Sequence, residues 1–296
     1  MADATLTPGV SVVEPVRSAG YWRNVGNRLV RDKTAMGAAF VLLVIVLAAI
    51  FAPLVAPMDP MQGRLINRLQ PIGSEGHWLG TDELGRDMLS RLIWGGRLSL
   101  LMGVLPVVLA FFVGSAIGII AGYAGGWTNT LIMRTVDVFY AFPSVLLAVA
   151  LSGALGAGLG NAMLSLTVVF IPPIARVAES VTTRLRSSDF IEAARASGAG
   201  ALTIMRVHVL GNVLGPIFVY ATSLIAVSMI LASGLSFLGL GVRPPNPEWG
   251  LMLNTLRTAI YAQPWVAALP GAMIFMVSIS FNLLSDGLRS AMEVRQ

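Results

Sequence analysis

The sequence predicts an all-α, polytopic membrane protein with six transmembrane helices. Of its 296 residues, 55% are hydrophobic and only 12% are charged, and the mean hydropathy is +0.76. Ordinary soluble domains carry about 25% charged residues. The chain also contains charge-poor runs long enough to cross a bilayer, which takes about 20 apolar residues in a helix. Because a spanning segment must satisfy its backbone hydrogen bonds internally, we expect these runs to be helical.

Five apolar runs supply the six spans: 34–58, 98–133, 138–175, 209–242 and 258–285. The third run is too long for one helix, and the glycines between Gly153 and Gly160 divide it into two spans. Prolines are expected to kink the second, third and fourth spans: Pro106, Pro143, Pro172 and Pro173. The chain then divides into an N-terminal segment 1–33, a first helix 34–57, an outer segment 58–97, a core of five helices 98–287 with a polar loop 180–211, and a tail 288–296.

Basic residues indicate the orientation of the chain. Arg17, Arg23, Arg28, Arg31 and Lys33 precede the first span. Basic residues near span ends are retained in the cytoplasm, so we expect a cytoplasmic N-terminus. Six crossings return the C-terminus to the same side. The bias is moderate, because arginines also occur in the outer segment. No cleavable signal is expected, since the first apolar run begins after more than 30 residues and is long enough to span.

Several chemistries lack the residues they need. The chain has no cysteine, and its two histidines, His77 and His208, fall on opposite sides of the membrane in this topology. No charged residue lies near a predicted span centre, which disfavours an ion-coupled carrier. Lys33 is the only lysine, and Asp32 precedes it where a phosphate loop needs glycine. We therefore expect no metal site, no bound cofactor, no catalytic residues and no nucleic-acid partner.

A polar segment, 187–208, interrupts the apolar runs on the cytoplasmic side. Asp189 is predicted to cap a helix, with Glu192 bonding back to the amide of the cap, and Gly198 is predicted to end it. A helix of about two turns is too short to be stable alone, so contacts must hold it. Its small and charged positions suit docking into a groove on a partner: Glu192, Ala193, Ala194, Arg195 and Ala196. An ordinary surface helix is the other interpretation.

The same segment carries a family resemblance. The tripeptide Glu192-Ala193-Ala194 is followed by Gly198 and later by Ile204, His208, Val209, Leu210 and Asn212. This pattern resembles the EAA loop of binding-protein-dependent ABC importer permeases. Segments 77–100, 141–144, 236–253 and 282–293 resemble the C-type permeases of dipeptide and oligopeptide importers, a group that includes nickel and glutathione permeases. Two positions depart from the family pattern, Ala201 and Gly211, where aspartate and proline are usual.

The resemblance implies a type I ABC importer permease fold in the bacterial inner membrane and a transport function. Such a chain moves di- or oligopeptides, or a related small solute, and has no enzymatic activity. Its expected partners are a homologous B-type permease in a heterodimer, two ATPase subunits that bind ATP and Mg, and a periplasmic or extracellular solute-binding protein. The resemblance also assigns the ATPase-docking coupling helix to Asp189, Glu192, Ala193, Ala194, Arg195 and Gly198. A self-contained channel or secondary carrier is the alternative function.

Two further sets of residues are candidate sites. Polar and flexible side chains of the fifth span are candidates for the translocation path, with close helix packing as the other interpretation: Thr222, Ser223, Met229 and Ser233. Outer residues are candidates for contact with the binding protein or the partner permease: Thr81, Asp82, Arg86, Asp87 and Trp249. We expect Arg86 to pair with a neighbouring carboxylate, and Thr81 or Asp82 to cap a short helix. Trp249 and Trp265 are expected at the membrane interface.

Overall fold

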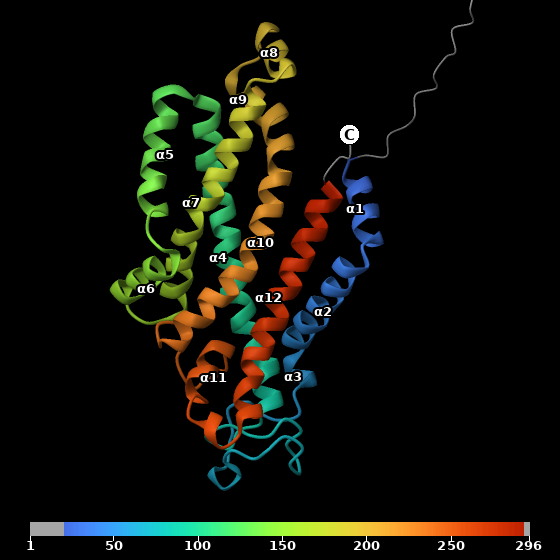
Figure 1. The fold of residues 1–296 in the computed structure, drawn as a ribbon, viewed down its shortest axis with the longest axis vertical. Coiled ribbons are helices and arrows are strands. Elements are labelled where there is room, and N and C mark those ends of the chain that lie inside the picture. The colour runs from blue at the N-terminus through green and yellow to red at the C-terminus, as the bar shows by residue number, and fades with distance from the viewer. Residues whose placement is uncertain (1–20, 293–296) are drawn as a thin grey trace, which may run out of the picture.

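A computed structural model describes residues 21–292 of the chain and confirms the all-helical architecture (Figure 1). Arg17 and the end of the tail, 293–296, lie outside the described residues. The elements are α1 (Tyr21–Arg31), α2 (Lys33–Ile50), α3 (Ala52–Val55), η1 (Leu65–Asn67), α4 (Met88–Ala124), α5 (Gly126–Tyr140), α6 (Ser144–Leu155), α7 (Leu159–Arg186), α8 (Asp189–Ala196), α9 (Ala201–Thr203), η2 (Ile204–Val209), α10 (Leu210–Phe237), α11 (Trp249–Thr255), η3 (Ala259–Tyr261) and α12 (Pro264–Met292).

The described residues contain five helices long and apolar enough to span a membrane, or six if the bent pair of α5 and α6 is one span. The prediction of six spans is confirmed when the bent pair of α5 and α6 is counted as one span. The third span differs in form, because it starts at Gly126 and bends by 85° between its two helices. Pro143 stands at the bend, where it disfavours a helical conformation for Phe142. Both α4 and α7 continue as helices through their internal prolines.

Two helices are longer than the hydropathy pattern predicts. The second span begins at Met88, earlier than the predicted boundary at 98, because the Asp87 carboxylate caps α4 by accepting a hydrogen bond from the Ser90 amide at 2.8 Å. The predicted cap at Thr81 or Asp82 is therefore wrong. The fourth span, α7, continues past the predicted end at 175 to Arg186.

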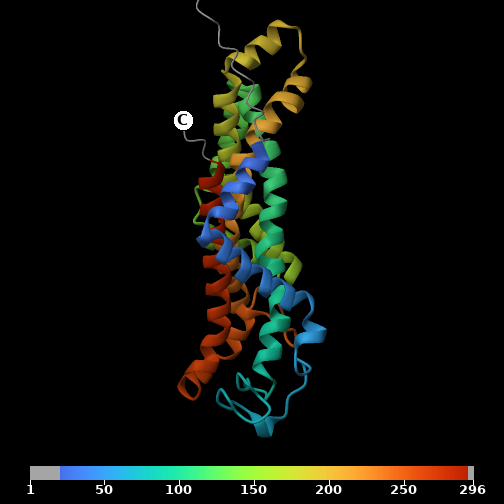
Figure 2. The same ribbon diagram turned by 90° about the vertical axis from the view of Figure 1, so that its right-hand side faces the viewer.

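The polar segment and the outer segment lie at opposite ends of the molecule. Figures 1 and 2 both place α8 at one end and the irregular chain between α3 and α4 at the other. The end of α12 lies beside α1, towards the α8 end (Figure 1). This arrangement agrees with the predicted assignment of the two segments to opposite sides of a membrane.

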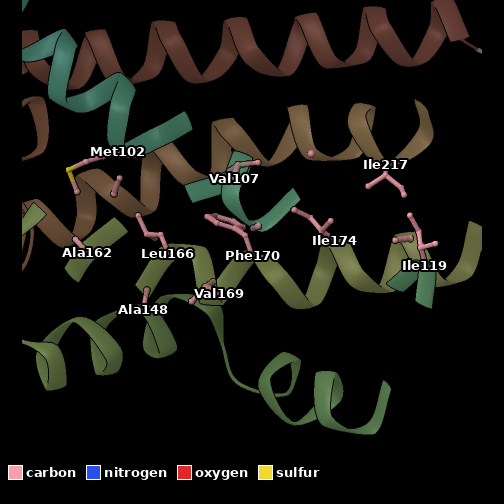
Figure 3. Packing of buried hydrophobic residues seen from close by; sticks show 14 of the residues in the cluster. Met102, Val107, Ile119, Ala148, Ala162, Leu166, Val169, Phe170, Ile174 and Ile217 are labelled. Carbon is pink, nitrogen blue, oxygen red and sulfur yellow. The ribbon is translucent and has the colours of Figure 1, made fainter. Parts of the chain in front are cut away.

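The main hydrophobic core surrounds α7. Figure 3 shows buried side chains of α4, α6, α7 and α10 meeting along it: Met102, Val107, Ile119, Ala148, Ala162, Leu166, Val169, Phe170, Ile174 and Ile217. A second cluster joins α2, α11 and α12 to the outer half of α4. The helix α7 thus lies at the centre of the helix bundle.

Three glycines bring α4 against α7. Gly114, Gly118 and Gly122 follow one another at intervals of four residues, so they lie on one face of α4. A Cβ added at Gly114 would come within 2.9 Å of the Ile171 carbonyl oxygen, and one at Gly122 would come within 2.8 Å of the Glu179 carbonyl oxygen. Such spacing of small residues permits close backbone approach in membranes.

Replacing Gly118 by alanine is expected to destabilise the protein by about 1–3 kcal/mol, as overpacking of a core does. The added methyl group would collide with the Ala175 carbonyl oxygen and with the Ala178 side chain. Thermal unfolding of the purified protein in detergent measures the effect. Gly37→Ala in α2 is the matched control, because an added Cβ there meets nothing within 4 Å. Equal unfolding temperatures for the two variants would contradict the close contact of α4 with α7.

Candidate functional site

The helix α8 forms the tip of the molecule, between α7 and α9. Its N-cap is Ser188 and not Asp189, so the predicted capping box is wrong. The Ser188 carbonyl accepts hydrogen bonds from the amides of Ile191 and Glu192, while its hydroxyl donates back to the Leu185 carbonyl of α7 at 2.6 Å. Asp189 and Glu192 instead lie in the first turn, where their negative charges interact favourably with the positive end of the helix dipole.

The C-terminal end of α8 follows the prediction for Gly198. This residue has φ +84, a conformation that side chains other than that of glycine rarely adopt. The Ala199 amide donates to the Ala194 carbonyl at 3.1 Å, and the Gly198 amide donates to the Arg195 carbonyl at 2.9 Å. This pair of bonds is the Schellman motif, which turns the chain sharply out of the helix.

One face of α8 is fixed to the rest of the protein. Ile191 is fully buried and belongs to the main core together with Ile204 and Val209. The Arg195 guanidinium lies 5.7 Å from the ring centroid of Tyr123, near the end of α4, in a cation–π contact. The remaining face is exposed and carries Asp189, Phe190, Glu192, Ala193 and Ala196. The helix thus presents small and charged side chains at the end of the molecule.

The chain after α8 returns to the core without a break. From Ala201 to Phe237 it forms one helical segment that includes the π-helical stretch η2. The two positions that depart from the family pattern, Ala201 and Gly211, are both exposed and within this segment. A Cβ at Gly211 would meet nothing within 4 Å. The chain is helical at both positions.

The candidate path residues of α10 pack inside the chain. Thr222, Met229 and Ser233 are buried, and Ser223 is partly buried. The hydroxyl groups of Thr222 and Ser233 donate to the carbonyls one turn earlier in α10, at 2.9 Å and 2.8 Å. Met229 packs against Gly103 of α4. The structure therefore supports the packing interpretation and does not place these side chains on an open path.

A groove of about 420 Å³ lies on a different face of α10. The elbow between α5 and α6, the middle of α7 and α10 line it with Phe139, Tyr140, Phe142, Ser144, Leu147, Val169, Phe170, Pro173, Tyr220, Leu224 and Val227. The Arg176 guanidinium is paired with the Asp137 carboxylate and lies 5.9 Å from the ring centroid of Tyr140. Sequence reasoning missed this groove because it depends on the bend of the third span.

The candidate contact residues of the outer segment are buried. Thr81, Asp82, Arg86 and Asp87 are all at most 5% exposed. Arg86 pairs with Asp82 at 2.6 Å and with Glu83 at 3.0 Å, which confirms the predicted ion pairing. These side chains hold the segment together and do not offer a surface to a partner.

Two further contacts, which the sequence did not reveal, complete the outer segment. Asp82 also lies 3.2 Å from the Arg91 guanidinium, and Asp87 lies 3.1 Å from the His77 ring. A hollow of about 720 Å³ opens beside them, lined by Asp59, Arg64 and His77 among others.

Trp249 is also an internal residue. It is fully buried, and its indole N–H donates to the Leu92 carbonyl at 2.9 Å, so its ring contacts the protein and not lipid. Its ring packs over Gly95 and Gly96 of α4. The neighbouring Glu248, which sequence reasoning missed, is buried and caps α11. Trp265, by contrast, is 77% exposed.

Among residues 21–292, no group of three or more His, Cys, Asp or Glu side chains is arranged to hold a metal ion. The described part of the chain offers three features instead: the exposed face of α8, the elbow groove and the rigid outer segment.

Comparisons with known proteins agree on one family. Residues 114–295 match the model described as "Binding-protein-dependent transport system inner membrane component". Residues 20–71 match the model described as the N-terminal TM domain of oligopeptide transport permease C.

Similar proteins are named as permeases of peptide transport systems. The chain is 39% identical over 272 residues to a glutathione transport system permease protein of Pectobacterium atrosepticum, covering 92% of this chain and 90% of that protein. It is 40% identical over 272 residues to a dipeptide transport system permease protein of Alkalihalophilus pseudofirmus, covering 92% and 89%. It is 41% identical over 288 residues to a di/tripeptide transport system permease protein of Pseudomonas aeruginosa, covering 96% and 94%.

A solved structure confirms the fold. Inward-facing conformations of the MetNI methionine ABC transporter contain a chain that superposes with a TM-score of 0.57 at 21% identity, covering 69% of this chain and 97% of that chain. The expected ABC importer permease fold is therefore correct.

Replacing Asp82 by asparagine is expected to loosen the outer segment. The Asp82 carboxylate accepts hydrogen bonds from the amides of Leu84 and Arg86 and pairs with two buried guanidinium groups. Breaking a buried pair on one side costs about 3–5 kcal/mol. Trypsin cleavage at the exposed Arg64 and Arg68 should accelerate, as measured by limited proteolysis.

The matched control is Glu75→Gln, because the Glu75 side chain is exposed. Its cleavage rate should equal that of the wild type. Unchanged cleavage of the Asp82→Asn variant would show that the buried charges do not hold the segment.

Proposed function

This chain belongs to the family of binding-protein-dependent transport system inner membrane components, and we propose that it is the permease subunit of an ATP-driven importer of di- or oligopeptides or a related small solute. The names of its relatives support this cargo class, because proteins about 40% identical over nearly the whole chain are named for dipeptide, di/tripeptide and glutathione transport.

The arrangement of α8 carries the proposal. The helix is fixed through Ile191 and Arg195, while Glu192 and Ala193 face outward at the end of the molecule. An ATPase subunit that docks on this face would pull on α7 and α10 together, since α8 and its short connections join the two. Both are long helices of the main core, so the pull would act as a rigid-body rotation across the membrane.

The complete importer needs other chains. We infer that a homologous B-type permease forms a heterodimer with this one, that two ATPase subunits bind ATP and Mg, and that a solute-binding protein delivers the cargo. In this assembly α8 and both termini are cytoplasmic. The outer segment, with its internal ion pairs, then offers the binding protein a surface of fixed shape around the hollow beside His77.

Reconstitution in lipid vesicles tests the function. The complete complex should take up labelled dipeptide only when ATP and the binding protein are present. The chain alone should conduct no solute. Solute flux through the chain without ATPases would instead favour the alternative, a self-contained channel or secondary carrier.

Replacing Gly198 by valine is expected to reduce ATP hydrolysis that depends on loaded binding protein, while the complex still inserts and assembles. A left-handed backbone costs residues with a side chain about 1–2 kcal/mol, and this would shift the population of the docked helix by about 5- to 30-fold. An ATPase assay in vesicles measures the loss.

Gly200→Val is the control, because Gly200 has an extended backbone with φ −67 and ψ 155 and open space around its Cβ position. It should retain coupled hydrolysis. Full coupling in the Gly198→Val complex would argue against the docking role of α8.

A further inference from the structure

We propose that the elbow groove is a transient binding site for the transported peptide in its zwitterionic form, with the two charged termini of the peptide replacing the ion pair between Asp137 and Arg176. This inference rests on the proposed function and adds to it the place and the chemistry of cargo contact within the permease.

The position of the ion pair is the first observation. Arg176 lies inside α7, ten residues before its end at Arg186, which corresponds to about 15 Å along the helix axis. Its side chain is 49% exposed, and that of its partner Asp137 is 34% exposed. Because α7 is about 42 Å long and the hydrocarbon core is about 30 Å thick, Arg176 lies towards the α8 end of the span, where a charged group typically faces a bundle interior or a water-filled cavity. This face of the chain is therefore suited to an aqueous path between two permeases.

The groove beside the pair is the second observation. Its volume of about 420 Å³ lies within the range of small-ligand sites, which is about 300–1,000 Å³. Aromatic side chains from three elements form its walls, among them Phe142, Phe170 and Tyr220. A mostly apolar wall makes few specific hydrogen bonds, so it can contact peptide side chains of different kinds. A groove of this type therefore suits peptides of varied sequence.

The two observations belong to one site because Tyr140 joins them. Its ring lines the groove and also lies under the Arg176 guanidinium. Asp137 and Arg176 lie beside the groove and not in its lining, so a short peptide would place its side chains in the groove and both termini at its rim by Tyr140. Its ammonium group would then meet the Asp137 carboxylate, and its carboxylate the Arg176 guanidinium. An exposed ion pair contributes little to stability, so this exchange of partners costs little and the cargo is released easily.

A purely structural role for the pair makes a different prediction. If Asp137 and Arg176 only join α5 to α7, the groove would not distinguish a charged peptide from an uncharged one. Protection of a groove residue by peptides with free and with blocked termini therefore separates the two roles without any change to the ion pair.

The absence of cysteine in the chain makes this measurement direct. Ser144 lines the groove and is exposed, so Ser144→Cys places a single thiol there. In the complete purified transporter, the alkylation rate of this chain by iodoacetamide is measured with dialanine, with trialanine and with N-acetyl-dialanine amide. Thr128→Cys at the start of α5 is the control thiol, because Thr128 is exposed and lies outside the groove.

We expect dialanine or trialanine to slow alkylation of Ser144→Cys at least about fivefold, and the blocked peptide to have no effect. Adding Asp137→Asn and Arg176→Gln together, which keeps hydrogen-bonding groups but removes both charges, should abolish protection while the complex remains assembled. Equal protection by free and blocked peptides, or none by either, would overturn the inference. So would equal protection of the Thr128→Cys thiol.

ATP-dependent uptake of the same peptides by the same preparation, with binding protein added, separates the two proposals. Uptake without charge-dependent protection would reject the groove as the cargo site and leave the proposed function standing. Absence of uptake of both free peptides would reject the peptide cargo, and this inference with it.

Discussion

The close contact between α4 and α7 is the constraint on which the rest of the fold depends. Gly114, Gly118 and Gly122 allow the two backbones to approach along three successive turns. Lipid is as apolar as the side chains of a helix, so close packing must supply what burial of apolar surface supplies in water. The contact also places the end of α4 beside α8, where Tyr123 meets Arg195. One helix pair thus positions both the core and α8.

The other end of α4 is held by polar contacts. Asp87 caps the helix, and Asp82, in the segment that leads into it, pairs with the buried guanidinium groups of Arg86 and Arg91. Trp249 fixes α11 against the same part of α4 through its indole hydrogen bond. Under the proposed function, the chain transmits motion from one side of the membrane to the other and needs a stiff element between the two sides. The helix α4 is anchored at both ends and meets that need.

Composition and spacing predicted the number of spans, the two-turn length of α8 and the left-handed turn at Gly198, because these features are local. The burial of α10 is not local. In a membrane helix the lipid-facing and core-facing sides are both apolar, so hydropathy could not show that Thr222 and Met229 face inward while Tyr220 lines a groove. The kink at Pro143 was predicted from the proline itself, but its angle of 85° and the groove beside it depend on packing. The glycine spacing in α4 was visible in the sequence and would have predicted the contact with α7.

The helix α7 connects α8 to the groove. This helix leads to α8 at one end and carries Arg176 ten residues before that end. Phe170 lies in the groove, about 1.7 turns further from α8 than Arg176. The partner of Arg176 is on α5, across the elbow, so a rotation of α7 changes the separation of the charged pair. Under the proposed function, docking of an ATPase on α8 therefore changes the groove through the same rigid helix. Binding of cargo and closure of the ATPases are then coupled through the movement of α7, and no chain of charged residues along the path is needed.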